Sequence, residues 1–408
     1  MKIVIVTYGT EGDTRPFAAL CRGLMDAGHE AHLLADASTL GSARALAVPS
    51  TPLTGDIRAT INDRTIASAV AKGGGFQETA RVLAKMVNDN SESWLRATIH
   101  AAQGAGAILA VGLAGFAGLS AAEYLGIKGI GAGIIPITPT AAFPSPFLPP
   151  RWVPRPFNRL SHTLVNSLFW RSFREKTNAA RAAIGLAPRR KVWTDIPMLY
   201  GASPHLLPPP PDWPAYVRLC GQWLVPSPAW QPPPALESFL AAGEPPVYVG
   251  FGSMTGFDTA RLLDALIRAL NGRRALFHAG WSGIDPHSLP GNFHVLGDTP
   301  HDWLFPRTAA VIHHGGGGTT HSAARAGVPS IVTPFAGDQF FWADRLRLAG
   351  VAPAAMDGQK PSAETFARAL DFAARAEVRN RARELGEKLR SENGVRDAVS
   401  FLERLVAS

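Results

Sequence analysis

Residues 311–320 read VIHHGGGGTT, in which an apolar run leads through two histidines and four glycines to a pair of threonines. The segment predicts a strand, a glycine turn and a helix that opens at the threonines. Glycines let the backbone approach a ligand closely, and a helix N-terminus presents N–H groups with the positive end of the helix dipole. The turn therefore suits a diphosphate, with His314 to add a proton or a hydrogen bond and Thr319 to add a hydroxyl. The plainer interpretation is a tight turn, for which one or two glycines would suffice.

The same rhythm of strand, turn and helix runs through both halves of the chain. In the C-terminal half we expect strands at 247–251, 275–278, 293–296, 310–313 and 330–333, and helices at 258–270 and 376–406. In the N-terminal half we expect strands at 3–6, 32–34, 107–111 and 129–135, and helices at 17–27 and 76–103. This alternation is typical of parallel sheets covered by helices, so the predicted fold class is α/β with two parallel-sheet domains.

Proline marks the connection between the halves. The stretch SPHLLPPPPDWP begins at Ser203, and VPSPAWQPPP follows at Val225. Proline removes a backbone donor and fixes φ, so neither a helix nor a central strand can run through these stretches. The sequence predicts a first domain at 1–210, a linker at 211–235 and a second domain at 236–408, whose final helix could pack back on the first. A length of 408 residues agrees with two domains.

Composition excludes several classes of protein. The chain is 46% hydrophobic and 18% charged, which favours folded cores over general disorder. Cys21 and Cys220 are too few and too far apart for a disulfide framework or a thiolate metal site, so we expect a reducing, cytoplasmic setting. The N-terminal apolar run is too short for the core of a signal peptide. The uncharged stretch 104–122 fits a buried strand and a tightly packed helix better than a membrane span.

The net charge of +8 lies in the first half, since residues 1–220 hold 22 basic and 14 acidic side chains and the remainder holds 18 of each. Residues 151–191 alone carry ten basic side chains against the single acid Glu175. Aromatic residues interleave with them: Trp152, Phe157, Phe169, Trp170 and Phe173. For the segment 143–191 two interpretations stay open: peripheral contact with an anionic membrane at its inner face, or a solvated basic helix beside an apolar cleft. Nucleic acid is not expected, because no recognised nucleic-acid module accompanies the segment.

The first predicted strand ends in the turn GTEGDTRPF, residues 9–17. The turn lacks the G-x-G-x-x-G fingerprint, which disfavours an NAD-dependent oxidoreductase, although Asp36 stands where a ribose-binding acid would. Asp13 follows the carboxyl end of the strand, where open α/β sheets bind ligands, and could accept a proton from a hydroxyl as a general base. Alternatively, Asp13 caps a helix that begins at Pro16.

Two further turns offer polar groups. Asp338 and Gln339 follow the strand at 330–333 and suit sugar hydroxyls, or else cap the next helix. The segment 297–304, GDTPHDWL, could supply backbone groups and side chains to a base and a ribose. Five histidines within 28 residues suggest zinc as a rival, but they fall on alternating strand faces and separate loops without a ligand spacing. The sequence also lacks D-x-D, so we expect neither a metal site nor a cofactor.

Taken together, the motifs resemble those of the family 1 nucleotide-sugar-dependent glycosyltransferases, which have the GT-B fold: two facing Rossmann-like domains with the active site in the cleft between them. The resemblance covers nearly the whole chain and rests on GTEGDTRPF (9–17), AGHE (27–30), FGS (251–253), PHDWLFP (300–306), HHGGGGTT (313–320), AGVP (326–329) and PFAGDQFFWA (334–343). PHDWLF and PFAGDQFF are most similar to the branch of the sterol and lipid glucosyltransferases, with the antibiotic-aglycone transferases close by.

The resemblance implies roles for single residues. Asp13 would be the general base, near Thr10 and Gly12 in the first turn. The donor diphosphate would be held by Ser253, His314, Gly316, Gly317, Gly318 and Thr319. The nucleoside would be held by Thr299 and His301, and the donor sugar by Asp338 and Gln339. Gly317 departs from the relatives, which often have Ser or Ala there, and we expect little consequence.

The implied reaction is an inverting transfer of a hexose, with UDP-glucose as the default donor, to a hydroxyl of a lipophilic acceptor such as a sterol, another lipid or a polyketide-type aglycone. The glycine turn, the helix dipole and His314 would offset the charge on the leaving diphosphate without a metal. A dTDP-deoxysugar donor, as in rhamnosyl transfer for antibiotic or glycolipid biosynthesis, is the alternative within the family. Outside it, the chain could be a sugar-nucleotide-binding auxiliary protein that does not transfer. The oligomeric state stays open.

Overall fold

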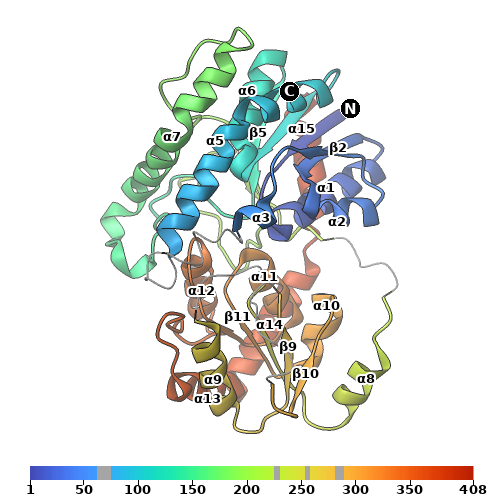
Figure 1. Cartoon of the computed structure of the whole chain (residues 1–408), viewed down its shortest axis with the longest axis vertical. Coiled ribbons are helices and arrows are strands. Elements are labelled where there is room, and N and C mark those ends of the chain that lie inside the picture. The colour runs from blue at the N-terminus through green and yellow to red at the C-terminus, as the bar shows by residue number, and fades with distance from the viewer. Residues whose placement is uncertain (62–74, 225–229, 253–257, 281–288, 408) are drawn as a thin grey trace.

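The computed structural model describes residues 1–61, 75–224, 230–252, 258–280 and 289–407, which form two α/β domains, drawn one above the other in Figure 1. All strand pairings in both sheets are parallel among these residues. The predicted fold class of two parallel-sheet domains is therefore confirmed.

The first sheet has the order β3-β2-β1-β4-β5-β6-β7. Its strands are β1 Lys2–Val6, β2 Glu30–Asp36, β3 Ser50–Leu53, β4 Ala107–Val111, β5 Lys128–Gly133, β6 Met198–Tyr200 and β7 Val217–Leu219. The helices around it are α1 Glu11–Asp26, α2 Gly41–Ala45, α3 Ile57–Ile61, α5 Gly75–Ala101, α6 Gly115–Leu125 and α7 Asn158–Ala182. The central strands β1 and β4 are apolar on both faces because helices cover the sheet from both sides.

The second sheet has the order β10-β9-β8-β11-β12. Its strands are β8 Val247–Gly250, β9 Ala275–His278, β10 Phe293–Val295, β11 Ala310–His313 and β12 Ser330–Val332. The helices that follow the linker region are α8 Pro234–Ala241, α9 Thr259–Leu270, α10 His301–Leu304, α11 Gly317–Ala326, α12 Gln339–Leu348, α13 Ala363–Ala374, α14 Ala376–Ser391 and α15 Gly394–Ala407. In each sheet the order reverses beside the first strand of the domain, at β1 and β4 or at β8 and β11, and ligands of open α/β sheets bind at such points.

The expected start of the first helix is wrong. The helix α1 begins at Glu11, with Thr10 as its N-cap, and Pro16 lies inside it rather than at its start. Thr10 and Asp13 form a reciprocal capping box, which satisfies N-terminal amides five residues earlier than the proline signal suggested. Asp13 consequently lies in the first turn of the helix and not before it.

The chain crosses between the domains twice. β7 is the edge strand of the first sheet, although its residues fall in the stretch expected to be linker, 211–235. After the second domain, α15 packs against α1, and its Phe401 and Leu402 join the apolar core under the first sheet. The two crossings meet where Gly221 contacts Gly394.

One apolar cluster belongs to both domains. Phe143 of the first domain lies against Phe341 of α12, with ring centroids 5.1 Å apart, and Tyr200 and Trp342 belong to the same buried group. Buried contact of this kind fixes how the carboxyl edges of the two sheets face each other. Within the described part of the chain, none of the helices is both long enough and apolar enough to cross a membrane.

Candidate functional site

The loop after β1 holds Asp13 by two hydrogen bonds. The Thr10 backbone N–H donates to Asp13 Oδ2 at 2.8 Å, and the Thr10 hydroxyl donates to the same oxygen at 3.2 Å. The other carboxylate oxygen, Oδ1, has no partner within the described residues. Burial raises the pKa of Asp13 above its ordinary value, and the bonds from Thr10 oppose that rise. Asp13 therefore caps α1, as one interpretation predicted. Its Oδ1 is left for the role of a general base, which stays a prediction.

Gly9 is required by this arrangement, although the sequence did not single it out. A Cβ on Gly9 would lie 2.3 Å from Asp13 Oδ2, which is closer than atoms can approach. Any side chain at this position would displace the carboxylate. Gly12 differs, because it is exposed and a Cβ there would meet nothing nearer than the Thr10 hydroxyl at 3.7 Å.

The glycine turn after β11 opens α11 with free amides. Gly316 is the N-cap, no side chain caps the helix, and the first backbone bond within the helix is from Thr320 N–H to Gly316 O at 2.9 Å. The N–H groups of Gly317, Gly318 and Thr319 therefore have no acceptor within the helix, which is the arrangement that binds phosphate.

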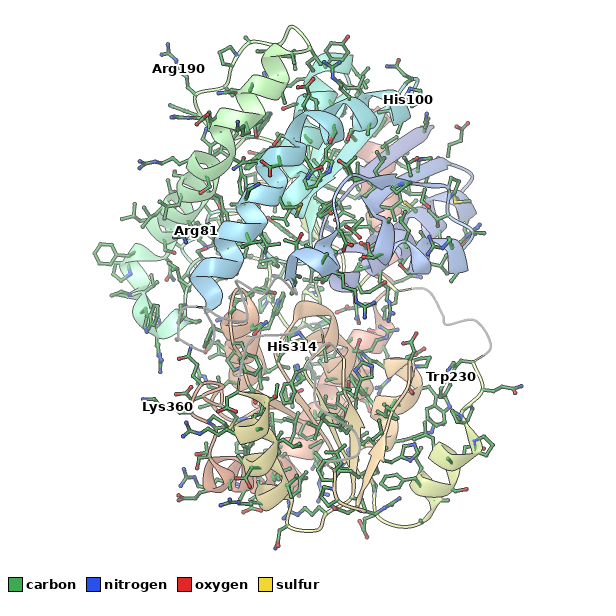
Figure 2. All side chains as sticks on the ribbon, viewed as in Figure 1. Arg81, His100, Arg190, Trp230, His314 and Lys360 are labelled. Atoms are coloured by element: carbon green, nitrogen blue, oxygen red, sulfur yellow. The ribbon has the colours of Figure 1, made fainter. Side chains whose placement is uncertain are left out.

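His314 lies beside these amides, against Gly252 of the turn after β8 and against Gly316. Its Nδ1 is buried without a hydrogen-bond partner in the described part of the chain. Burial lowers the pKa of His314 to about 4, so the ring is neutral near pH 7. Its one N–H can donate a hydrogen bond to a phosphate, but the neutral ring does not act as an acid that protonates it. Figure 2 shows His314 at the boundary between the two domains.

Gly317 touches the first domain. A Cβ on Gly317 would lie 2.7 Å from Ile134 Cγ2, just after β5, and 3.1 Å from the indole nitrogen of Trp342. The expectation of little consequence at this position therefore does not fit the geometry, because the glycine permits the close approach of the two domains. Gly318 is unlike it, since a Cβ there would meet nothing within 4 Å.

Trp342 of α12 orients Asp338. The Trp342 indole N–H donates to Asp338 Oδ2 at 2.8 Å. Burial raises the pKa of Asp338 to about 7; the bond from Trp342 opposes the rise, and the charge of Asp13 adds to it. The charge of Asp13 in the first domain thus acts on Asp338 in the second.

Gln339 orders its own turn. Its Oε1 accepts hydrogen bonds from the backbone N–H groups of Phe335 at 2.7 Å and Ala336 at 3.1 Å. These bonds order the loop before α12 and do not cap the helix, because no side chain of the described residues caps α12. The predicted contact of Gln339 with a sugar stays a prediction.

The predicted nucleoside residues are partly in place. His301 opens α10 and stacks on Phe305, with ring centroids 4.2 Å apart. Burial lowers the pKa of His301 to about 3, and the nearby charges of Arg15, His278 and His314 lower it further, so His301 lies close to the diphosphate residues. Thr299 donates only to Gly297 O of its own loop, at 3.3 Å. Ser253, the remaining predicted residue, lies outside the described residues.

Two charged residues of α1 that sequence reasoning missed, Glu11 and Arg15, act on groups of this loop. Glu11 Oε2 is buried without a hydrogen-bond partner in the described part of the chain. Burial raises the pKa of Glu11, the charge of Arg15 opposes that rise, and the charge of Asp298 adds to it. The charge of Asp298 thus acts on Glu11 although the two residues are nearly 300 positions apart in the chain, which no local pattern could reveal.

The neighbouring histidines have structural partners. His313 Nδ1 accepts from Gly315 N–H at 3.1 Å. His321 Nε2 accepts from Ser203 N–H at 3.0 Å, so its Nδ1 carries the proton that it donates to Gly317 O at 2.7 Å. His321 thereby ties α11 to the first domain. Among the residues that the structure describes, no three His, Cys, Asp or Glu side chains are grouped to hold a metal ion.

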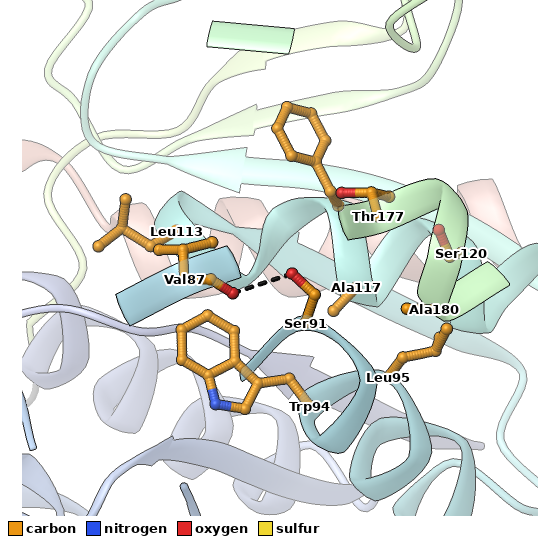
Figure 3. A pocket seen from close by; sticks show the side chains of 10 residues that line it. Val87, Ser91, Trp94, Leu95, Leu113, Ala117, Ser120, Thr177 and Ala180 are labelled. Atoms are coloured by element: carbon orange, nitrogen blue, oxygen red, sulfur yellow. Dashed lines mark hydrogen bonds between the residues drawn. The ribbon is translucent and has the colours of Figure 1, made fainter. Parts of the chain in front are cut away.

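Two hollows lie in the first domain. The space between α5, α6 and α7, lined by Ser91, Trp94 and Thr177 among others, measures about 10 Å³ and is a packing void at the limit for one water (Figure 3). An open hollow of about 390 Å³ lies between α3 and α5, lined by residues such as Asp56 and Met86. Only the second has the size of a site for a small molecule.

Comparison with known proteins gives relatives over the whole chain. Residues 276–400 match the family "Erythromycin biosynthesis protein CIII-like, C-terminal domain". The chain is 32% identical, over 99% of its length, to Sterol 3-beta-glucosyltransferase UGT80B1 of Arabidopsis thaliana, of which it covers 68%. It is also 32% identical, over 99% of its length, to Sterol 3-beta-glucosyltransferase of Emericella nidulans, of which it covers 30%.

Solved structures share the fold. The glycosyltransferase of kitacinnamycin matches with a TM-score of 0.72 and 18% identity, covering 99% of this chain and 98% of that one. The calicheamicin glycosyltransferase CalG4 matches with a TM-score of 0.69 and 17% identity, covering 100% of this chain and 98% of that one. At these identities the likeness shows the fold alone.

Proposed function

The chain belongs to the family 1 glycosyltransferases of the GT-B fold, close to the sterol glucosyltransferase branch, and is a hexosyltransferase; from this premise we propose that it moves glucose from UDP-glucose to a sterol hydroxyl. The sterol acceptor and the glucosyl group follow the names of the relatives. The carrying observation is that Asp13, in the first turn of α1, lies near enough for its charge to raise the pKa of Asp338, at the start of α12.

The two carboxylates suit different tasks. Asp13 has an unpartnered Oδ1 and a raised pKa, as a general base for a hydroxyl requires. Asp338 is fixed by Trp342 and suits hydrogen bonds from the hydroxyls of the donor sugar. An acceptor entering beside Asp13 would meet the anomeric carbon of a sugar that Asp338 holds.

The proposed step is a single displacement. The acceptor oxygen forms a bond to the anomeric carbon as its proton passes to Asp13 Oδ1. The bond from that carbon to the diphosphate oxygen breaks on the opposite side, and its electron pair goes to the diphosphate, which inverts the configuration. The amides of Gly317, Gly318 and Thr319 and a hydrogen bond from neutral His314 would stabilise the charge that develops there.

The test is transfer by the purified protein from UDP-glucose to cholesterol, followed by mass spectrometry and by NMR of the anomeric proton. The proposal expects a β-glucoside from the α-linked donor. A product that retains the α configuration, or no product with any sterol, would overturn it. The dTDP-linked donor that the sequence left open is tested in the same assay with dTDP-glucose and dTDP-rhamnose, and faster turnover with either would replace UDP-glucose in the proposal.

A further inference from the structure

The outer side of α7 exposes an unusual run of large apolar side chains. Of the thirteen large hydrophobic side chains that are exposed among the described residues, six lie between 152 and 169. Five of these, which we call the α7 face, are between 51% and 67% exposed: Trp152, Phe157, Leu160, Leu164 and Leu168. Their concentration in one segment needs an explanation that scattered surface residues do not.

Helix geometry gathers the three leucines of the α7 face on one side of α7. Leu160, Leu164 and Leu168 follow each other at intervals of four residues, which places them one above the other along the helix. The opposite side of α7, with Trp170 and Phe173, packs into the first domain against α5 and α6. The sequence had drawn attention to these two aromatics, whereas the structure buries them and exposes the leucines instead. In Figure 1, α7 lies at the outer edge of the molecule.

Basic side chains flank the α7 face at both ends. Arg151 precedes it, Arg155 lies between Trp152 and Phe157, and Arg171 and Arg174 follow it; all four are exposed and form no ion pair with another described residue. Three other basic residues of the segment form ion pairs within the domain. Arg181 and Arg189 pair with Glu123, and Arg159 pairs with Asp212 at 3.5 Å.

We propose that the α7 face docks on an anionic lipid bilayer. Apolar side chains on one side of a helix, flanked by arginines, match the acyl boundary and the phosphate headgroups of such a surface. A second copy of the chain fits poorly, because a two-fold interface through this face would set unpaired arginines of one copy against unpaired arginines of the other. The docking itself does not depend on which acceptor the enzyme uses.

The same segment reaches the second domain. The turn Pro150–Trp152 contacts α12, the helix that begins at Asp338 and Gln339. A bilayer bound at the α7 face would therefore lie beside the helix that the proposed function assigns to the donor sugar. A lipid acceptor would reach the enzyme from that side.

The experiment is co-sedimentation of the full chain with vesicles of phosphatidylcholine, with and without phosphatidylserine, at low and at high salt. We expect binding to the anionic vesicles that weakens with salt, and little binding to phosphatidylcholine alone. The triple variant Leu160→Ser, Leu164→Ser, Leu168→Ser should bind the anionic vesicles at least roughly tenfold more weakly than the wild type. The matched control Tyr124→Ser, Val295→Ser, which changes exposed apolar residues elsewhere, should bind as the wild type does.

Two outcomes would overturn the proposal. One is a failure of the vesicle test: the wild type stays in solution with anionic vesicles at low salt, or the triple variant binds them as strongly as the wild type. The other is a wild-type dimer that becomes a monomer in the triple variant, which would assign the α7 face to a second copy. The triple variant must melt at the wild-type temperature; otherwise Arg171→Gln, Arg174→Gln carries the test, by reducing the salt-sensitive part of binding. Loss of glycosyl transfer with intact vesicle binding would count against the proposed function alone.

Discussion

Single glycines decide how closely the functional groups approach one another. Gly9 makes room for the carboxylate of Asp13, and Gly317 makes room for Ile134 of the other domain. Neither role follows from the turn chemistry that draws attention to glycines in a sequence. The role of Gly317 depends on a side chain of the other domain, and that of Gly9 on how the helix orients Asp13, four residues further on.

We predict that Gly317→Ala lowers the free energy of unfolding by about 1–3 kcal/mol, the usual cost of overpacking a close contact. The added Cβ would lie 2.7 Å from Ile134 Cγ2, and the β-branched Ile134 has little freedom to move. Chemical denaturation measures the effect. Gly318→Ala is the matched control, because its Cβ meets nothing within 4 Å. Equal stability of the two variants would show that Gly317 does not hold the domains together.

Gly9→Ala tests the loop after β1 in the same way. The new Cβ would displace Asp13 Oδ2, so we expect transfer to fall by roughly a hundredfold, the lower range for losing a general base. Nucleotide binding, measured by calorimetry, should stay as in the wild type because the donor residues are in the other domain. Gly12→Ala at the exposed neighbouring position should be nearly as active as the wild type, and a Gly9→Ala enzyme of equal activity would contradict the role given to the loop.

Elements were predictable where the signal was local. Runs such as Ile3–Val6 and Val247–Phe251 are apolar, β-branched or aromatic, and bounded by turns, so their strands could be predicted to within a residue or two. The short strands β6 and β7 could not, because three residues beside prolines carry no periodic pattern. Their place in the sheet comes from pairing, of β6 with β5 and of β7 with β6.

The candidate site divides along the same line. Asp13, His314 and Asp338 stand at the carboxyl ends of strands in recognisable motifs, so the sequence could indicate them. Ile134 could not be found in this way, because its partner Gly317 belongs to the other domain. Trp342 lies four residues after Asp338 along α12, so helix spacing could have paired the two.

The helix α12 is predicted to tune Asp338 through Trp342. Donor binding should rise with pH through about 7, because ionised Asp338 accepts hydrogen bonds from sugar hydroxyls better than the protonated form does. Trp342→Phe removes the bond that favours the ionised form, so the midpoint should move up by roughly 1–2 pH units. Calorimetric titration with UDP-glucose across this range measures the midpoint. Trp94→Phe, which loses a comparable bond to Thr54 O in the other domain, should leave it unmoved.

At the scale of the molecule, buried histidines predict sensitivity to acid. Burial lowers the pKa of His301 and His313 to about 3 and of His314 and His321 to about 4. The unfolded chain takes up these protons as the pH falls through about 6.5, whereas the folded chain does not, so their contribution to stability is present above that pH and is lost below it.

Thermal unfolding near pH 7 and near pH 5 checks this expectation. The melting temperature of the wild type should fall on acidification. That of His313→Asn, whose Oδ1 can accept the Gly315 N–H in place of Nδ1, should fall less. The exposed His100→Asn should follow the wild type. An equal fall in all three proteins would remove His313 from the account.

In the proposed function the two domains make one site, because each supplies what the other lacks. The first brings Asp13, and the second brings the amides of α11, His314 and Asp338. The shared cluster around Phe143 and Phe341 holds them in register. Catalysis by proximity requires this alignment, since a base and a donor on separate bodies must meet at one carbon.

The most direct measurement is a comparison of donor binding and transfer in Asp13→Asn. Asparagine can still accept the Thr10 N–H, so α1 should keep its cap, while the basic oxygen is lost. The account predicts UDP-glucose binding close to that of the wild type and transfer reduced by roughly a hundredfold or more, with Asp26→Asn at the other end of α1 fully active. Undiminished transfer by Asp13→Asn would contradict the assignment of Asp13 as the base.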